Sequence, residues 1–324
     1  MPEPDNTRRD ADSGLVKIAT FNAENFYMLL DRDYSSEEFG LLANTDYLSM
    51  NKSIYNPNKD LDKIGAIART ILDEDFDFVG LSEVGGLETL ENFNRYYLDG
   101  RYECHLHQEN SNRGIFVGAL VRTGRFRYTK AKNMAGGFSR NLLKVTLGLG
   151  SGLRSGLGTE LKPGHGPGTE TGPVTVHRSG LRATELVIFV VHLKSQYGND
   201  LGIEQRIREV RQLARLLPRR RCIVMGDFNG ILIRGEHQFE FEPLMELPFR
   251  DVQEALGVPI PQRFTHFYFG ARPNFSQLDY ILCSDDIEVL DGGVISDIIP
   301  VNYEQRSRLP SDHLFLKASV HISP

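Results

Sequence analysis

Residues 222–230, CIVMGDFNG, join a short apolar run to a group of polar side chains. The first four residues have the length and composition of a strand that is buried on both faces. Side chains alternate along an extended chain, so we expect Asp227 and Asn229 to point to the same side. A buried strand that ends in an acid and an amide predicts a polar site at the edge of a sheet.

The same pattern recurs along the chain. Polar residues also stand at or near the ends of other strand-like runs: Asn22 (ATFN), Glu83 (GLSE), His192 (FVVH), Asp279 (QLDYIL), and Asp312 and His313 (SDHLFL). Taken singly, most have ordinary explanations, such as an asparagine in a turn or a histidine within a sheet. Asp279 is harder to explain in this way, because a carboxylate in an apolar run is costly to bury without a partner.

Taken together, these side chains are the groups that hydrolysis of a phosphate ester requires. One or two carboxylates, with waters and a substrate phosphate, are typical ligands of Mg²⁺. A histidine held by a carboxylate can act as a general base, and further donors can stabilise charge on the phosphate. The sequence has no nucleophile-elbow motif and no Cys/His signature, which favours metal-assisted attack by water.

The composition limits the class of protein. The chain has 324 residues, of which 40% are apolar and 25% charged, as in globular proteins with a sizeable core. A net charge of −6 argues against non-specific coating of nucleic acid, so any such contact should be confined to a site. The longest apolar stretch, residues 186–193, is too short to cross a bilayer. We therefore expect no stable membrane association, and we expect a monomer.

Three cysteines, two of them in strand-like runs, predict buried thiols in a reducing compartment, and the cytoplasm is the expected location.

Apolar periodicity predicts many short strands and few helices, and hence two packed sheets with helices outside. Strands are expected near residues 15–21, 77–82, 114–121, 126–132, 141–147, 185–193, 222–226, 264–269, 278–283, 287–295 and 314–320. Helices are expected near 61–72, 87–98 and 203–217, the last burying Ile203, Ile207, Val210, Ala214 and Leu217. The stretch from about residue 22 to 60 is expected to be irregular. Residues 1–14 are predicted to be a disordered tail, and 15–324 one domain with a flexible Gly-rich insertion at 148–180.

The order of these motifs resembles that of the endonuclease/exonuclease/phosphatase superfamily, the deoxyribonuclease I-like hydrolases, and most closely a bacterial branch with HLKSQ and RGI segments. The matching segments lie between about residues 15 and 320: TFNAEN, VGLSEV, NRGIFVGALVR, FSRNLLKVTL, VVHLKSQ, VMGDFNG, QLDYIL and SDHLFL. Each segment is short, but chance would not place all of them in this order. The resemblance implies an α/β fold, a four-layer α-β-β-α sandwich of two packed mixed sheets, with the site at one end of the sheets.

The resemblance also implies roles for individual residues. The implied ligands of Mg²⁺ or Mn²⁺ are Glu83, Asn22 and Asp312. The implied catalytic residues are His313, Asp279, Asp227, Asn229 and His192. In this assignment His313, oriented by Asp279, polarises the attacking water. Asp227 positions that water or protonates the leaving group, and His192 and Asn229 hold the scissile phosphate.

Basic residues close to these motifs in sequence are candidates for phosphate contacts. They are Arg113, Arg140 and Lys194, and arginine in particular suits phosphate oxygens because it can donate two parallel hydrogen bonds. Three positions depart from the pattern of the superfamily. Ser82 stands where many relatives have glutamine, Phe116 where an acid is expected, and His266 where an aromatic residue is common. None of the three is an implied catalytic residue, but together they leave the substrate open.

The function predicted from these observations is metal-dependent phosphodiester hydrolysis by a nuclease of DNA or RNA, with endo- and exonucleolytic cleavage both open. A phosphoesterase of phospholipid or inositol-phosphate head groups is the alternative, because the same catalytic set would serve it. A binding module without activity is a third possibility. The complete set of acids and histidines argues against it.

Overall fold

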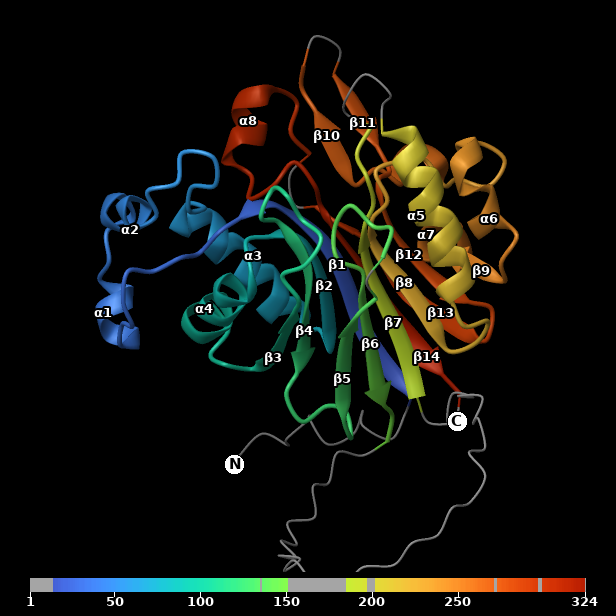
Figure 1. Cartoon of the computed structure of the whole chain (residues 1–324), viewed down its shortest axis with the longest axis horizontal. Coiled ribbons are helices and arrows are strands. Elements are labelled where there is room, and N and C mark those ends of the chain that lie inside the picture. The colour runs from blue at the N-terminus through green and yellow to red at the C-terminus, as the bar shows by residue number, and fades with distance from the viewer. Residues whose placement is uncertain are drawn as a thin grey trace, which may run out of the picture.

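The computed structural model describes residues 14–134, 136–150, 185–196, 202–270, 273–296 and 299–323. Two six-stranded mixed sheets pack face to face at its centre (Figure 1). In the first sheet the order is β13 (Ile287–Ile295), β14 (Phe315–Ile322), β1 (Leu15–Phe26), β2 (Phe78–Val84), β4 (Phe116–Arg122) and β3 (Tyr102–Leu106). In the second it is β5 (Thr129–Asn133), β6 (Leu143–Gly148), β7 (Glu185–His192), β8 (Cys222–Asp227), β12 (Asp279–Ser284) and β9 (Phe249–Asp251).

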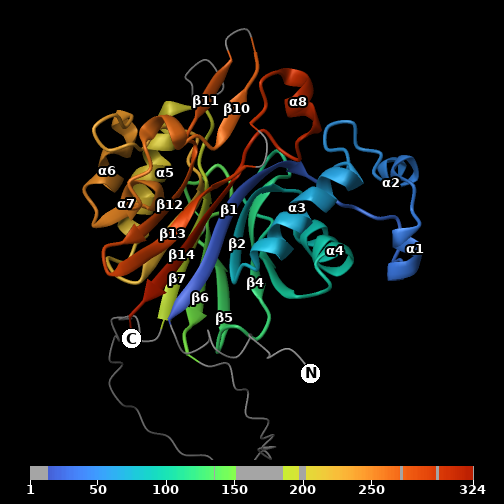
Figure 2. The same cartoon turned by 180° about the vertical axis from the view of Figure 1, so that it is seen from behind.

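Helices cover the outer faces of both sheets, as Figure 2 shows from behind. The first sheet is flanked by α1 (Ser36–Gly40), α2 (Asn44–Met50), α3 (Leu61–Glu74) and α4 (Leu87–Tyr97). The second is flanked by α5 (Ile203–Leu216), α6 (Glu242–Met245) and α7 (Val252–Ala255). A small hairpin of β10 (His266–Tyr268) and β11 (Asn274–Ser276) lies at one end with α8 (Tyr303–Arg308). Two 3₁₀ turns, Phe239–Phe241 and Ile260–Gln262, complete the described elements.

Three apolar clusters fill the spaces between the four layers. The middle cluster lies between the sheets and includes Ile18, Val190 and Met225. At Gly80 the sheets approach closely, since an added Cβ would lie 3.0 Å from Met225 Sδ. The outer clusters join each sheet to its helices, through residues such as Phe93 on one side and Leu213 on the other. The four-layer α-β-β-α architecture implied by the resemblance is thus the observed one.

Some elements were not predicted. β1 continues to Phe26, and the stretch expected to be irregular contains α1 and α2. These helices have only five and seven residues, too few to display a helical repeat. β3 was also missed, because its five residues do not alternate cleanly between buried and exposed. No described helix has the length and apolar character that crossing a membrane would need.

The predicted buried face of α5 was wrong by about one residue. Val210 and Leu217 are buried as expected, but Ile203, Ile207 and Ala214 are only half-buried. Arg206 and Glu209 lie on the buried face instead. This rotation becomes important at the site.

β6 and β7 pair in antiparallel register and connect across the predicted insertion. Leu143 pairs with Val190 near one end of the ladder, and Gly148 pairs with Glu185 at the other. Residues 151–184, which hold most of the insertion, lie outside the described residues, as do residues 1–13 of the predicted tail.

Candidate active site

The site lies where strands from both sheets end. β1 and β2 run parallel, as do β7 and β8, so the carboxyl ends of each pair meet at one edge. In each of four strands, a polar residue lies two or four positions along the chain from a residue of the inter-sheet core. The pairs are Ile18 and Asn22, Val190 and His192, Met225 and Asp227, and Ile281 and Asp279. Because strand side chains alternate with period two, these polar residues continue the inward-facing rows of the core. Alternation thus directs four polar side chains into one space.

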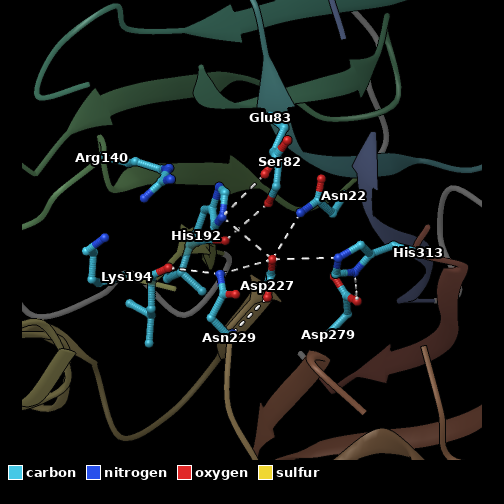
Figure 3. A network of polar contacts seen from close by, with 12 residues as sticks. Asn22, Ser82, Glu83, Arg140, His192, Lys194, Asp227, Asn229, Asp279 and His313 are labelled. Atoms are coloured by element: carbon cyan, nitrogen blue, oxygen red, sulfur yellow. Dashed lines mark hydrogen bonds and ion pairs between the residues drawn. The ribbon is translucent and has the colours of Figure 1, made fainter. Parts of the chain in front are cut away.

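Asp227 lies at the centre of this group (Figure 3). Its Oδ2 accepts hydrogen bonds from the side-chain amides of Asn22 at 3.0 Å and Asn229 at 3.2 Å. His192 Nε2 lies 3.6 Å and His313 Nε2 4.0 Å from the same oxygen. Burial raises the pKa of Asp227 to about 7, although the charge of His313 acts in the opposite direction. A carboxyl group in this state can hold or release a proton near neutral pH.

Asn229 reaches Asp227 by a turn and not by strand alternation as predicted. β8 ends at Asp227, and Asn229 has a φ of 52°, in the left-handed region that asparagine tolerates better than most residues. Asp227 Oδ1 accepts the backbone N–H of Asn229 at 2.8 Å and closes the turn. The amide of Asn229 also donates to the carbonyl of Leu193 at 3.0 Å, which joins the ends of β7 and β8.

His313 and Asp279 form a buried pair. His313 Nδ1 lies 2.6 Å from Asp279 Oδ2, and Asp279 is fully buried. Ser311 Oγ accepts the backbone N–H of His313, and Thr265 Oγ1 accepts that of Asp279, so both partners are held from behind. Burial alone would lower the pKa of His313, but the negative charges of Asp279 and Asp227 raise it to about 10. The imidazole therefore carries a proton at neutral pH.

Three buried polar atoms around Asp227 have no hydrogen-bond partner among the described residues. They are His192 Nδ1, Arg140 Nε and Asp279 Oδ1. Burial, followed by the positive charges of Arg140 and His313, lowers the pKa of His192 well below its usual value, so this imidazole is neutral. Buried polar groups are satisfied in most proteins, and a cluster of unsatisfied ones is typical of a site that binds a polar ligand.

Glu83 enters the site from β2 through an irregularity in the sheet. The register of β2 shifts between Leu81 and Val84, and Glu83 has a φ of 62°. Such irregularities often redirect a side chain beside an active site. Glu83 Oε2 accepts the N–H of Asn25 at 3.0 Å, whereas Oε1 accepts no hydrogen bond among the described residues and lies 3.9 Å from His192 Nε2.

The oxygen donors near Glu83 fit Mg²⁺ or Mn²⁺ in chemical type. Two hard oxygen ligands are the free Oε1 of Glu83 and the amide oxygen of Asn22, which among the described residues accepts only the N–H of Glu24. Within the described residues no three His, Cys, Asp or Glu side chains are grouped as a metal cage. A cation held by a single carboxylate, with waters and a substrate phosphate at its other coordination positions, agrees with both observations.

Asp312 has different neighbours from the other two predicted ligands. Its Oδ2 pairs with Arg306 at 3.2 Å and lies 3.9 Å from His266 Nε2, and its Oδ1 lies 4.0 Å from His313 Nε2. Although burial raises its pKa, the charges of these three partners lower it overall. Among the described contacts, none joins Asp312 to Glu83. The structure therefore places Asp312 beside His313 and Arg306.

The predicted phosphate-binding residues differ in exposure. Arg140 is buried and lies beside His192 in Figure 3, and burial lowers its pKa. Lys194 follows the end of β7 on the same side of the site. Arg113 is exposed and donates to Asn25 Oδ1 at 3.1 Å. Arg140 and Lys194 thus belong to the site itself, and Arg113 lies at its rim.

Sequence reasoning missed three buried charges behind the site. Arg206 of α5 pairs with Glu240 in the core and donates from Nη1 to the carbonyls of Lys194 and Asn229, both at 3.2 Å. Glu209, also of α5, accepts the backbone N–H of Lys194. These residues hold the loops after β7 and β8 in place. For Arg206 and Glu209, the signal in the sequence is a charged residue at a helical position that neighbours the apolar ones.

Comparison with known proteins gives consistent results. A family model described as Endonuclease/Exonuclease/phosphatase family matches residues 19–313. Among solved structures, TDP2 from D. rerio complexed with single strand DNA product has a TM-score of 0.57 at 16% identity, covering 95% of this chain and 99% of that one.

Two structures from Bacteroides thetaiotaomicron are also similar. An endonuclease/exonuclease/phosphatase family protein has a TM-score of 0.54 at 15% identity, over 96% of this chain and 98% of the other. A mannosyl-6-phosphatase has a TM-score of 0.53 at 16% identity, over 94% and 99%. At these identities the likeness shows a shared fold. No curated protein matches the sequence.

Proposed function

Because this chain belongs to the Endonuclease/Exonuclease/phosphatase family, whose members hydrolyse phosphate esters, we propose that it is a divalent-metal-dependent phosphodiesterase acting on nucleic acid. The observation that carries the proposal is the arrangement around Asp227. One buried carboxyl group lies within 4.0 Å of both His192 and His313 and accepts hydrogen bonds from two asparagine amides. These are the proton-transfer and charge-stabilising groups that attack of water on a phosphodiester needs.

Glu83 and Asn22 are the residues we propose to hold Mg²⁺ or Mn²⁺, with Asp312 contributing from the side of His313. When bound, the cation supplies Lewis-acid stabilisation of negative charge on the phosphate. The free Glu83 oxygen supports this assignment.

In this proposal Asp227 and His313 act as a pair: Asp227 accepts the proton of the attacking water, and the positively charged imidazole of His313 stabilises the negative charge beside it. Their closest atoms lie 4.0 Å apart, a gap that one water or phosphate oxygen can bridge. Asp279 fixes the orientation of the His313 ring through Nδ1 and leaves Nε2 directed at the site. Asp227 then supplies the proton to the leaving oxygen.

The proposed position of the scissile phosphate is surrounded by the neutral imidazole of His192, the amide of Asn229 and the cation of Arg140. His192 can donate one hydrogen bond without adding a charge, and Arg140 compensates the charge that develops on the phosphate. Lys194 and Arg113 would contact phosphates next to the reacting one. The three cysteines are free thiols, in agreement with the reducing, cytoplasmic location that we propose.

The test is a substrate panel assayed with Mg²⁺ or Mn²⁺. It comprises single-stranded DNA, duplex DNA, RNA, bis(p-nitrophenyl) phosphate, mannose 6-phosphate, sphingomyelin and an inositol phosphate. We expect metal-dependent hydrolysis of the nucleic acids and of the simple diester. Selective hydrolysis of the lipid or of an inositol phosphate would support the alternative function, and hydrolysis of the sugar monoester alone would exclude a phosphodiesterase. His313→Ala serves as the inactive control.

A further inference from the structure

The outer face of α5 carries a row of arginines. Arg208, Arg211 and Arg215 follow one another at intervals of three and four residues, and Arg219 comes four residues later, just past the helix. Residues at these spacings lie on one side of a helix. All four side chains are exposed, and together they define the arginine stripe. The buried charges Arg206 and Glu209 lie on the opposite side.

The arginine stripe has few counter-charges. Arg208 donates to Gln205 Oε1 at 2.8 Å, and the three other arginines form no hydrogen bond or ion pair with the described residues. A hollow of about 490 Å³ next to α6 is lined by Arg211, Arg215, Arg219 and, as its one acid, Glu246. In a chain whose net charge is −6, an uncompensated row of cations attracts a polyanion.

The arginine stripe leads away from the active site. α5 begins directly after Gly202, whose backbone packs against Ser195 and the side-chain carbons of Lys194. Glu209 then ties the helix to the backbone of Lys194. From Arg208 to Leu216 the helix rises about 12 Å further along the flank of the second sheet. α5 thus starts beside Lys194, and the stripe lies further along the outer face of the same helix.

We propose that the arginine stripe binds the backbone phosphates of a single-stranded nucleic acid whose reacting phosphate lies in the active site. The inference rests on the proposed function and adds a binding surface to it. The active site is at the strand ends, whereas the stripe runs along the side of the sandwich, so a bound chain must turn between them. A duplex, with a persistence length of about 150 base pairs, resists such a turn, whereas a single strand can follow it.

The experiment compares binding of a short and a long strand. Fluorescein-labelled oligothymidylates of about five and about 25 nucleotides would be titrated in excess chelator, to prevent turnover, at several KCl concentrations. The test variant is Arg211→Gln/Arg215→Gln/Arg219→Gln. The control is Arg32→Gln/Arg101→Gln/Arg250→Gln, which removes the same charge from positions that are 55%, 49% and 57% exposed elsewhere. Thermal melting checks that both variants fold.

We expect the test variant to bind the long strand about tenfold or more weakly than the control variant, and the short strand within about twofold of wild type. The slope of log K against log salt should fall by about 2, since each lost single-strand phosphate contact removes about 0.7. Equal affinity and slope in the test and control variants would overturn the inference. The inference would also be overturned if the test variant lost binding to phosphatidylserine vesicles but kept its affinity for the long strand.

Failure of the stripe and failure of the proposed function give different results. Hydrolysis of bis(p-nitrophenyl) phosphate does not need the stripe, so the test variant should retain the wild-type kcat on it. If the test variant binds the long strand like wild type and still hydrolyses the diester, the inference about the arginine stripe is excluded and the proposed function stands. If the wild type does not hydrolyse phosphodiesters, the proposed function is excluded.

Discussion

The carboxylate of Glu209 accepts a hydrogen bond from the backbone N–H of Lys194 at 2.7 Å. Its other oxygen accepts the backbone N–H of Ser139 at 2.6 Å, next to Arg140. One fully buried side chain of α5 thus fixes two loops that come from different strands and carry two of the site's cations. The carboxylate of Glu209 accepts hydrogen bonds from these backbone donors, which makes it a positioning residue for the proposed phosphate-binding side of the site.

We expect Glu209→Gln to lower kcat/KM for a phosphodiester by about tenfold to a hundredfold, because a displacement of about 1 Å in a positioning group has effects of this size. The amide can accept from only one of the two backbone N–H groups and presents its own NH₂ to the other. Steady-state kinetics and thermal melting would be measured together. Glu204→Gln, on the exposed first turn of α5, is the matched control and should leave kcat/KM unchanged. An unaffected kcat/KM in a folded Glu209→Gln protein would show that the two loops keep their positions without this acceptor.

Removal of the His313 imidazole should reduce kcat by about 10²- to 10⁴-fold, the usual contribution of a positioned acid–base group. The pair model adds that Asp227→Asn and His313→Ala should be strongly non-additive, because each removes the same proton-transfer unit. The measurement is kcat for both single variants and the double variant on one substrate. Losses that multiply in the double variant would contradict a shared role.

The pKa of His313 should be high in the metal-free protein and should depend on Asp279. Burial lowers it, but Asp279 and then Asp227 raise it to about 10, so the folded value lies above the usual one of about 6.5. A raised histidine pKa adds stability that is fully present below about pH 6.5 and is lost as the pH rises through about 10. Asp279→Asn should bring the pKa down toward 6.5, which histidine NMR titration would measure. A titration of His313 near 6.5 in the wild type would contradict the charge arrangement described above.

The sequence predicted the fold well, because the fold depends on local patterns, and it singled out polar residues that the structure brings together around Asp227. Apolar runs locate most of the strands, and strand alternation correctly brings Asn22, His192 and Asp227 to the inter-sheet face. Long strands and the helices with a repeating apolar face were the easiest to find. Short elements such as α1, α2 and β3 were missed, since five to seven residues give too few repeats.

What the sequence could not provide depends on neighbours that are distant along the chain. Asn229 reaches Asp227 by a left-handed turn, and Glu83 enters the site through a positive φ, and neither follows from periodicity. The partner of Asp312 is Arg306, which a motif alone does not reveal. Protonation is a property of the whole cluster, since the pKa of Asp227 and that of His313 are set by burial and by charges on other strands.

Glu83→Gln should raise the Mg²⁺ or Mn²⁺ concentration needed for half-maximal rate, because a neutral amide attracts a divalent cation less strongly than a carboxylate. Calorimetric titration of Mn²⁺ would report the same weakening without any assay of activity. Chelation should abolish turnover reversibly, and zinc should not be required. Unchanged Mn²⁺ affinity in Glu83→Gln, with Glu88→Gln on α4 as a control, would place the cation elsewhere.

Replacing residues 151–184 by a short turn should leave kcat within a few-fold of wild type. The β6–β7 register supports this expectation, because Leu143 pairs with Val190 near the site and Gly148 pairs with Glu185 at the far end of the ladder. Glu185 and His192 are the two ends of the eight-residue strand β7, so the replaced segment joins the sheet about 23 Å from the catalytic end. Stability should also change little, since the cost of loop closure varies only with the logarithm of loop length. Turnover and thermal melting of the shortened protein would be compared with wild type. A hundredfold loss of kcat with an unchanged melting temperature would show that the segment takes part in catalysis in spite of where it joins the sheet.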